Sequence, residues 1–200
     1  AVMATTLQEG VGSPRCLDAG LPVGVLALLD VRDELDDAAA AVGGAVGGRA
    51  RIVETRKTLP GLRALEKAAV RAGGGANHRG NLSDWVLLKD NHLELFGIAD
   101  AVTRARTRWP GRTVHVECGD LDQVRQAVEA GADALLLDNM SPDEVRAVVA
   151  EVRERDPRRP LLEISGTVSL ETIRLYATTG ADLVSIGALT HSAPVLDIGL

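Results

Sequence analysis

Aromatic side chains are scarce in this chain of 200 residues, because phenylalanine, tryptophan and tyrosine together make up only 2% of it. Single-stranded nucleic acids are held largely by bases that stack on aromatic rings, so the sequence offers little material for such a surface. The formal net charge of −6 gives no general electrostatic attraction to nucleic acid either. We therefore expect a protein with no nucleic-acid partner.

Cysteine and long apolar runs are also scarce. The two cysteines, Cys16 and Cys118, are far apart and fit no CxxC or Cys/His pattern, which argues against a zinc site and fits a reducing compartment. The apolar segment 21–31 is too short to span a bilayer and lacks the basic start of a signal peptide. These features predict a soluble, cytoplasmic protein with no membrane partner.

From residue 50 onward, a short apolar run, a polar or glycine turn and an amphipathic stretch recur in that order. Apolar runs without alternation are typical of parallel strands that are covered on both faces. Strands that alternate with helices predict right-handed βαβ units, so the fold class is α/β, either barrel-like or doubly wound. We predict strands at 50–55, 84–90, 113–118, 134–139, 161–166 and 183–188, with helices that include 120–131, 141–155 and 169–180.

Residues 1–49 lack this regularity. An acid-led stretch from residue 31 begins like a helix, but the pairs Gly43-Gly44 and Gly47-Gly48 each cost about 1–2 kcal/mol of helix propensity. We therefore divide the chain into an irregular N-terminal segment, 1–49, and an α/β domain, 50–200.

Polar or glycine residues follow each predicted strand, at the rim where parallel α/β folds bind their ligands. Helix capping explains some of them, but it does not explain why cations stand at strand ends. The residues are Thr55-Arg56-Lys57, Lys89-Asp90-Asn91-His92, Glu117, Asp138-Asn139, Ser165-Gly166-Thr167 and Gly187-Ala188-Leu189-Thr190-His191.

The charges in this set suggest two anionic ligands. Carboxylates and phosphates are what a cationic group recognises, and here that group comprises Arg56, Lys57, Lys89, His78 and Arg79. Glu117 and Asp138 form an acidic pair suited to Mg²⁺ that also binds substrate phosphates. The small-residue turns Ser165-Gly166 and Gly187-Ala188 let backbone N–H groups approach a phosphate. This combination indicates group transfer from a phosphorylated donor.

Other polar features have simpler interpretations. Segment 72–80, "AGGGANHRG", follows a helix and matches no P-loop, so a flexible loop is the favoured interpretation. His92 and His115 are predicted to be structural or surface residues rather than ligands. The role of Asp90 is left undecided: it either belongs to a helix start or is a carboxylate that holds a lysine.

Six stretches together resemble the quinolinate phosphoribosyltransferase family, in order and without large gaps from about residue 50 to the C-terminus. They are "ETRKTLPGLRALEK", "GGGANHRGNLSDWVLLKDNH", "VECGDLDQVRQAVEAGAD", "LLLDNMSP", "LEISGTVSLETI" and "VSIGALTHSAPVLDIGL". The resemblance implies an open, incomplete parallel α/β barrel. It also implies transfer of a phosphoribosyl group from phosphoribosyl pyrophosphate to quinolinate, which yields nicotinate mononucleotide, pyrophosphate and CO₂ in NAD biosynthesis, by a homodimer or higher homo-oligomer.

The same resemblance implies roles for individual residues. Quinolinate would be held by Thr55, Arg56, His78, Arg79 and Lys89. The phosphoribosyl donor would be held by Lys57, Glu117, Asp138, Ser165, Gly166, Thr167, Gly187, Ala188 and His191. Glu117 and Asp138 would bind Mg²⁺, and the catalytic set would be Lys57, Lys89, Glu117 and Asp138.

The chain departs from the family pattern at several places. Residues 1–49 do not resemble the longer N-terminal domain, which in the family lends an arginine to the partner's site, and neither Arg15 nor Arg32 has a supporting motif. Thr167 stands where glycine is usual, Gly80 where a larger residue is usual, and Gly199 where serine is usual. Two alternatives therefore stay open: a weakly active or inactive anion-binding remnant, and a phosphoribosyltransferase for another aromatic acid.

Overall fold

The computed structural model describes residues 47–155, 160–169 and 171–192, and it confirms all six predicted strands. They pair in parallel, in the order β1-β6-β5-β4-β3-β2. The strands are β1 (Arg51–Val53), β2 (Val86–Leu88), β3 (Val114–Cys118), β4 (Ala134–Asp138), β5 (Leu161–Ser165) and β6 (Leu183–Ser185).

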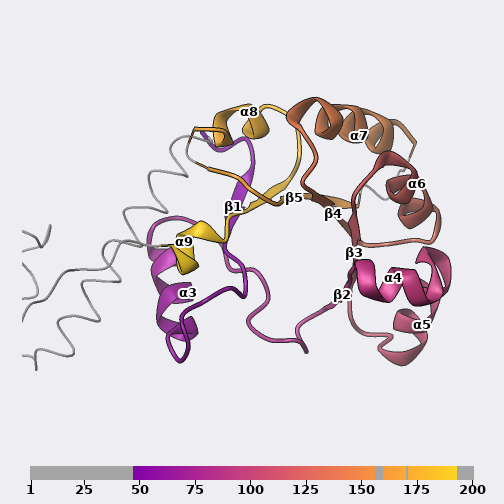
Figure 1. Ribbon diagram of the computed structural model, residues 1–200, viewed down its shortest axis with the longest axis horizontal. Helices are drawn as coiled ribbons and strands as arrows, with labels where there is room; N and C mark the ends of the chain where they lie inside the picture. The colour runs from indigo at the N-terminus through magenta and orange to yellow at the C-terminus, as the bar shows by residue number, and fades with distance from the viewer. Residues whose placement is uncertain (1–46, 156–159, 170, 193–200) are drawn as a thin grey trace, which may run out of the picture.

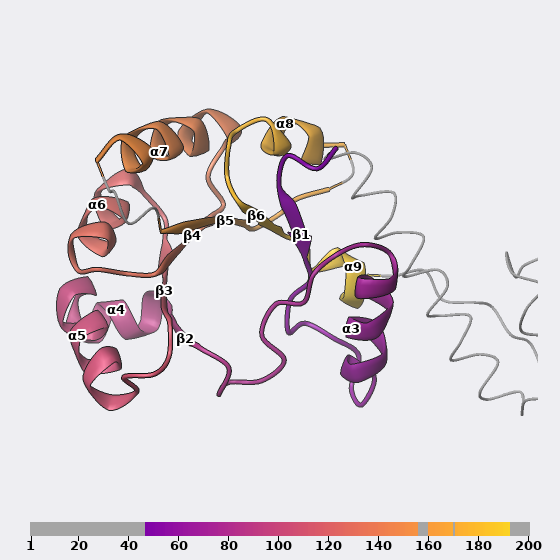
Figure 2. The ribbon, with the colours of Figure 1, turned by 180° about the vertical axis from the view of Figure 1, so that it is seen from behind.

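The sheet curves into an incomplete barrel, as predicted, with the strands around a centre and the helices outside them (Figures 1 and 2). β1 and β2 are the two end strands and do not pair with each other, so the ring stays open. The chain between α3 and β2 crosses this opening. Its start is attached to β1, because the Ala76 amide donates to the Ile52 carbonyl at 2.8 Å.

Seven helices lie in the described ranges: α3 (Arg63–Ala72), α4 (Asp90–Phe96), α5 (Ile98–Arg108), α6 (Leu121–Glu129), α7 (Pro142–Arg155), α8 (Ile173–Ala177) and α9 (Ala188–His191). The predicted helix at 120–131 corresponds to α6 and that at 141–155 to α7. The one at 169–180 is shorter than predicted. Ser169 begins a turn, in which its carbonyl accepts from the Thr172 amide at 3.2 Å, and Thr172 then caps α8.

Alternate residues of each strand face opposite sides, which separates the core from the barrel interior. The outer face packs against the helices, with Leu135, Leu137 and Ile164 almost fully buried. The inner face carries polar side chains such as Glu163 in the middle of β5 and Ser185 at the end of β6. The apolar runs therefore form a hydrophobic core between the sheet and the helices, while the interior of the barrel is partly polar.

The N-terminal segment 1–49 lies outside the described residues except for 47–49, and so do Arg15, Arg32 and Gly199. In the ranges that the structure covers, no helix has the length and apolar character needed to cross a membrane.

Candidate active site

A pocket of about 650 Å³ opens at the carboxyl ends of the strands. Every residue that the sequence analysis assigned to a substrate or to the metal lines this pocket, although these residues come from strand ends and connecting segments that are far apart in the sequence. The lining consists of Thr55, Arg56, Lys57, His78, Arg79, Leu87, Lys89, Glu117, Leu136, Asp138, Asn139, Glu163, Ser165, Gly166, Thr167, Val168, Ser185, Gly187, Ala188 and His191.

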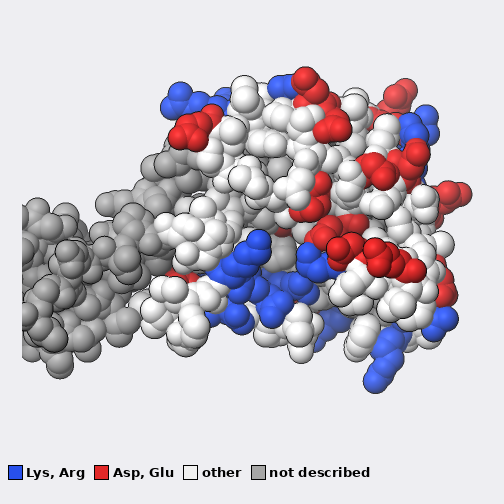
Figure 3. All heavy atoms as spheres, in the orientation of Figure 1, with Lys and Arg blue, Asp and Glu red and all other residues white. Residues whose placement is uncertain are grey.

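Two neighbouring guanidinium groups on one side of the pocket lack carboxylate partners among the described residues. Arg79 is only 8% exposed, and burial, followed by the nearby charge of Arg56, lowers the pKa of its guanidinium. The Nε atom of Arg56 is buried without a hydrogen-bond acceptor. Lys and Arg side chains gather at the centre of this face (Figure 3). Unpaired, partly buried cations of this kind form a site for an anion that carries more than one charge.

Arg63, the first residue of α3, ties together the two segments that carry these cations. Its Nη2 donates to the Arg56 carbonyl at 3.2 Å, and its Nη1 donates to the Gly80 carbonyl at 3.2 Å. Its Nε donates to the Thr58 hydroxyl at 3.0 Å. One planar guanidinium thus fixes the segment after β1 relative to the segment that contains His78 and Arg79.

The flexible-loop interpretation of 72–80 was wrong for its last residues. The His78 amide donates to Glu54 Oε1 at 3.1 Å, and Lys67 Nζ donates to the His78 carbonyl at 3.0 Å. Lys67 and Glu54 also form a buried ion pair. Local composition missed this order because the partners, Glu54 directly after β1 and Lys67 on α3, lie outside the loop itself.

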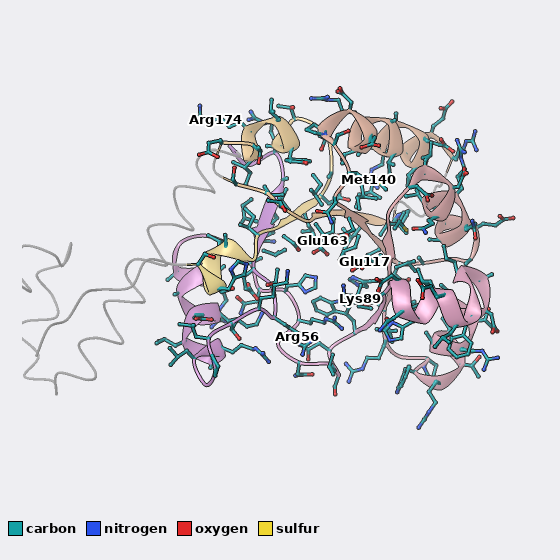
Figure 4. The ribbon with its side chains drawn as sticks, in the orientation of Figure 1. Arg56, Lys89, Glu117, Met140, Glu163 and Arg174 are labelled. Atoms are coloured by element: carbon teal, nitrogen blue, oxygen red, sulfur yellow. The ribbon has the colours of Figure 1, made fainter. Side chains whose placement is uncertain are left out.

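Sequence reasoning also missed Glu163, a carboxylate at the floor of the pocket that is 1% exposed. His78 Nε2 lies 3.2 Å from it, and the Ser185 hydroxyl donates to it. Figure 4 shows Glu163 near the centre of the barrel, above Arg56 and close to Glu117 in the view. The signal was present in the sequence, since Glu163 stands two residues before Ser165 and therefore shares its inward face.

The acidic side of the pocket contains Glu117 and Asp138 at the ends of β3 and β4. Glu117 lies opposite Leu136 of β4 in the sheet. Asp138 is two residues further along β4, so its side chain points to the same, inward face. Lys89 forms an ion pair with Glu117, and Asn139 Nδ2 donates to Asp138 Oδ2 at 2.8 Å. The carboxylate that contacts a lysine is thus Glu117, whereas Asp90 is exposed and accepts from the Asn91 amide.

Glu117 and Asp138 suit Mg²⁺ only if other ligands complete its coordination. Within the described ranges, no group of three or more histidine, cysteine, aspartate or glutamate side chains could hold a metal ion. Mg²⁺ often binds through one or two carboxylates together with substrate phosphates and water, and this donor set fits that arrangement. The residues present therefore suit an ion that arrives with a phosphorylated substrate.

The two small-residue turns line the pocket; glycine is required in the first, because its φ is positive, and it leaves room for His191 in the second. A Cβ on Gly166, whose φ is +118°, would lie 2.3 Å from Asn139 Oδ1, and a Cβ on Gly187 would lie 2.9 Å from His191 Nε2. Thr167, which stands where the family usually has glycine, is exposed.

Three other residues have structural positions, as the sequence predicted for the two histidines. His115 is buried and stacks on Trp85 with ring centroids 5.1 Å apart, and burial lowers its pKa to about 4. His92 is exposed, and its Nδ1 accepts from the Lys89 amide at 3.1 Å. Cys118 is buried, and burial raises the pKa of its thiol to about 12, so it is not a reactive nucleophile.

Comparison with known proteins agrees with this geometry. The family model described as "Quinolinate phosphoribosyl transferase, C-terminal domain" matches residues 36–200. The chain belongs to this family. The matched range begins within the segment 1–49 that the sequence analysis treated separately.

Curated relatives of the quinolinate phosphoribosyl transferase family are similar over much of the chain. The nicotinate-nucleotide pyrophosphorylase [carboxylating] of Mycobacterium leprae is 47% identical over 157 residues, which are 77% of this chain and 54% of that protein. The human protein of the same name is 36% identical over 203 residues, covering 100% of this chain and 68% of its own.

Solved structures of the family have the same fold. NadC from Streptococcus pyogenes superposes with a TM-score of 0.81 at 39% identity, covering 86% of this chain and 61% of that one. The nicotinate-nucleotide pyrophosphorylase from Ehrlichia chaffeensis gives a TM-score of 0.81 at 36% identity, covering 90% and 66%. This chain spans little more than half the length of the first curated relatives that it matches.

Proposed function

We propose that this chain carries the substrate pocket of a quinolinate phosphoribosyltransferase. The reaction transfers the phosphoribosyl group of phosphoribosyl pyrophosphate to the ring nitrogen of quinolinate and releases pyrophosphate and CO₂. The observation that supports it best is one pocket lined both by Arg56 and Arg79, which form no ion pair among the described residues, and by the carboxylates Glu117 and Asp138. The names of the relatives and of the matching family support the same activity.

Quinolinate is a dianion, and its nitrogen is a weak nucleophile beside one carboxylate. Arg56 and Arg79 suit this ligand because each guanidinium can donate two parallel hydrogen bonds to a carboxylate. His78 and Lys89 line the same pocket and would add further donors, although each already contacts a carboxylate, Glu163 and Glu117 respectively. Fixing both carboxylates aims the nitrogen at the sugar, an orientation gain that reaches several kcal/mol when the reacting atoms are well aligned.

The phosphorylated donor would lie over the carboxylates and the small-residue turns. Lys57, exposed at the rim, and the backbone N–H groups at Gly166 and Gly187 would contact its phosphates. Magnesium, held by Glu117, Asp138 and the phosphates of the donor, would supply positive charge where the departing pyrophosphate becomes more negative.

The bond changes need no covalent enzyme intermediate. The bond from the sugar C1 to pyrophosphate breaks with its electron pair on the leaving oxygen, and the ring nitrogen donates its lone pair to the oxocarbenium-like carbon. The ring nitrogen is then positive, so it stabilises the electron pair left on C2 when the adjacent carboxylate departs as CO₂. A proton completes C2. In this scheme Arg56, Arg79 and Lys89 hold the ring while the charge moves.

The test is to mix this chain with quinolinate, phosphoribosyl pyrophosphate and Mg²⁺ and to measure pyrophosphate and CO₂ in equal amounts. Nicotinate in place of quinolinate should give no CO₂ and little pyrophosphate, whereas turnover of another aromatic acid would favour the related transferase. Calorimetric titration with quinolinate, together with the pyrophosphate assay, distinguishes an active enzyme from an anion-binding remnant. An anion-binding remnant would bind quinolinate but release no pyrophosphate, and a chain that binds neither substrate would overturn the proposal.

We also propose that the working form is a homodimer or a higher homo-oligomer. Leu82 and Leu95 are 70% and 75% exposed, which supports contact with another surface. Sedimentation at several concentrations tests this, since a monomer at every concentration would contradict it.

A further inference from the structure

Asn139, which follows β4 in the pocket wall, has an uncommon backbone conformation. Its φ is +54°, and among the described residues it is the one non-glycine residue with a positive φ. Such a conformation costs an L-residue free energy, although asparagine tolerates it better than most. Backbone strain of this kind persists where the surrounding structure enforces it, and it often marks functional sites.

Three contacts connect Asn139 to both halves of the donor site. Its Nδ2 donates to Asp138 Oδ2 at 2.8 Å, and its own amide donates to the Ser165 carbonyl at 2.9 Å. Its carboxamide occupies the space beside Gly166, where the Oδ1 atom would lie 2.3 Å from an added Cβ. One side chain thus lies between the carboxylate at the end of β4 and the turn that follows β5.

We propose that Asn139 is a positioning residue for the phosphoribosyl donor and its Mg²⁺, an inference that rests on the proposed function. The carboxamide N–H group occupies one oxygen of Asp138 and thereby fixes the direction in which the other faces the pocket. Contact with Gly166 sets the spacing between that carboxylate and the turn that would approach a phosphate. The left-handed backbone is what brings the carboxamide of Asn139 over both.

A purely conformational role would make a different prediction. Glycine adopts a positive φ without strain, so Asn139→Gly preserves the backbone of the turn while removing the carboxamide. Asn139→Asp keeps the size of the side chain but replaces the donor by a second carboxylate beside Asp138. If Asn139 only permits the turn, the glycine variant should behave as the wild type.

The experiment is calorimetric titration of the chain with phosphoribosyl pyrophosphate in the presence of Mg²⁺, alongside thermal unfolding and titration with quinolinate. We expect Asn139→Gly to weaken donor binding about tenfold, the usual effect of losing a hydrogen bond to a charged group, and Asn139→Asp to weaken it at least as much. The quinolinate affinity should stay within experimental error of the wild type, and the Tm should fall by no more than a few degrees. Gln126→Glu makes the same amide-to-carboxylate change on the exposed face of α6 and should alter none of these values.

The outcomes separate this inference from the proposed function. If the wild type binds the donor and Asn139→Gly binds it equally well, Asn139 has no positioning role, while the proposed function stands. An equal loss of quinolinate and donor affinity, or a large fall in Tm, would show a general structural role and also overturn the inference. A wild-type chain that fails to bind the donor would overturn both.

Discussion

The ammonium group of Lys89 forms an ion pair with Glu117, so one of the two carboxylates suited to magnesium already has a cationic partner. Lys89 follows the end strand β2 and Glu117 belongs to β3, and Figure 4 shows the two side chains pointing toward each other. With half of the acidic pair neutralised, the free pocket presents little net negative charge to a lone divalent cation.

Magnesium alone should therefore bind weakly, and Lys89→Gln should strengthen its binding by releasing Glu117. The same variant should weaken quinolinate binding, because a cation is lost from the pocket. Titration with Mg²⁺, with and without phosphoribosyl pyrophosphate, measures the first effect. Arg71→Gln is the control, since Arg71 is an exposed cation on α3 that does not line the pocket. Tight binding of Mg²⁺ alone to the wild type would contradict this account.

Arg79→Ala should raise the KM for quinolinate about 10- to 100-fold, which is the usual range for losing hydrogen bonds between charged groups. Arg79 makes no hydrogen bond or ion pair with any described residue, but it is buried, so thermal unfolding of the variant is measured alongside KM. Arg104→Ala, at an exposed arginine on α5, is the control and should leave KM unchanged. A KM within twofold of the wild-type value in the Arg79 variant would remove this residue from the quinolinate site.

Folding stability should fall as the pH is lowered from about 6.5 to about 4 through the buried His115. Burial lowers the pKa of its imidazole from 6.5 to about 4 in the folded protein, so the unfolded chain binds the proton first. The loss is about 3 kcal/mol, at 1.36 kcal/mol for each pKa unit. Urea unfolding across this range measures it. His115→Gln and His115→Phe should both flatten the curve, and an equally steep curve in both would refute the assignment.

Lys67→Met should destabilise the fold by about 3–5 kcal/mol, because it leaves Glu54 charged, fully buried and without its ionic partner. The double variant Lys67→Met, Glu54→Met should recover much of this loss. Quinolinate affinity should be lower than that of the wild type in the double variant even though the stability is recovered, since the His78 amide has lost its acceptor on Glu54. Arg71→Met, at an exposed residue of the same helix, controls for the substitution itself. Urea unfolding and calorimetry give both values.

Local sequence features were sufficient for much of the fold and for most, but not all, of the polar residues of the pocket. An apolar run and the polar residue that ends it are adjacent in the chain, so the six strands and the residues at their ends could be found without tertiary information. The same is true of Gly131, a positive-φ glycine that directly follows the C-cap of α6. The sequence alone therefore predicted the site residues at the strand ends, from Thr55-Arg56-Lys57 after the first strand to His191 after the last.

Only the tertiary structure decided which of these groups meet. Lys89 and Glu117 are 28 residues apart, and His78 and Glu163 are 85 apart, so their pairing depends on strand order, register and the pleat of the sheet. A strand pattern gives the period of two but not which face points into the barrel. The strained turn at Asn139 likewise has meaning only beside Gly166, on the neighbouring strand end. The local sequence therefore determined which polar residues stand at the strand ends, and long-range packing determined which of their charged groups pair with each other.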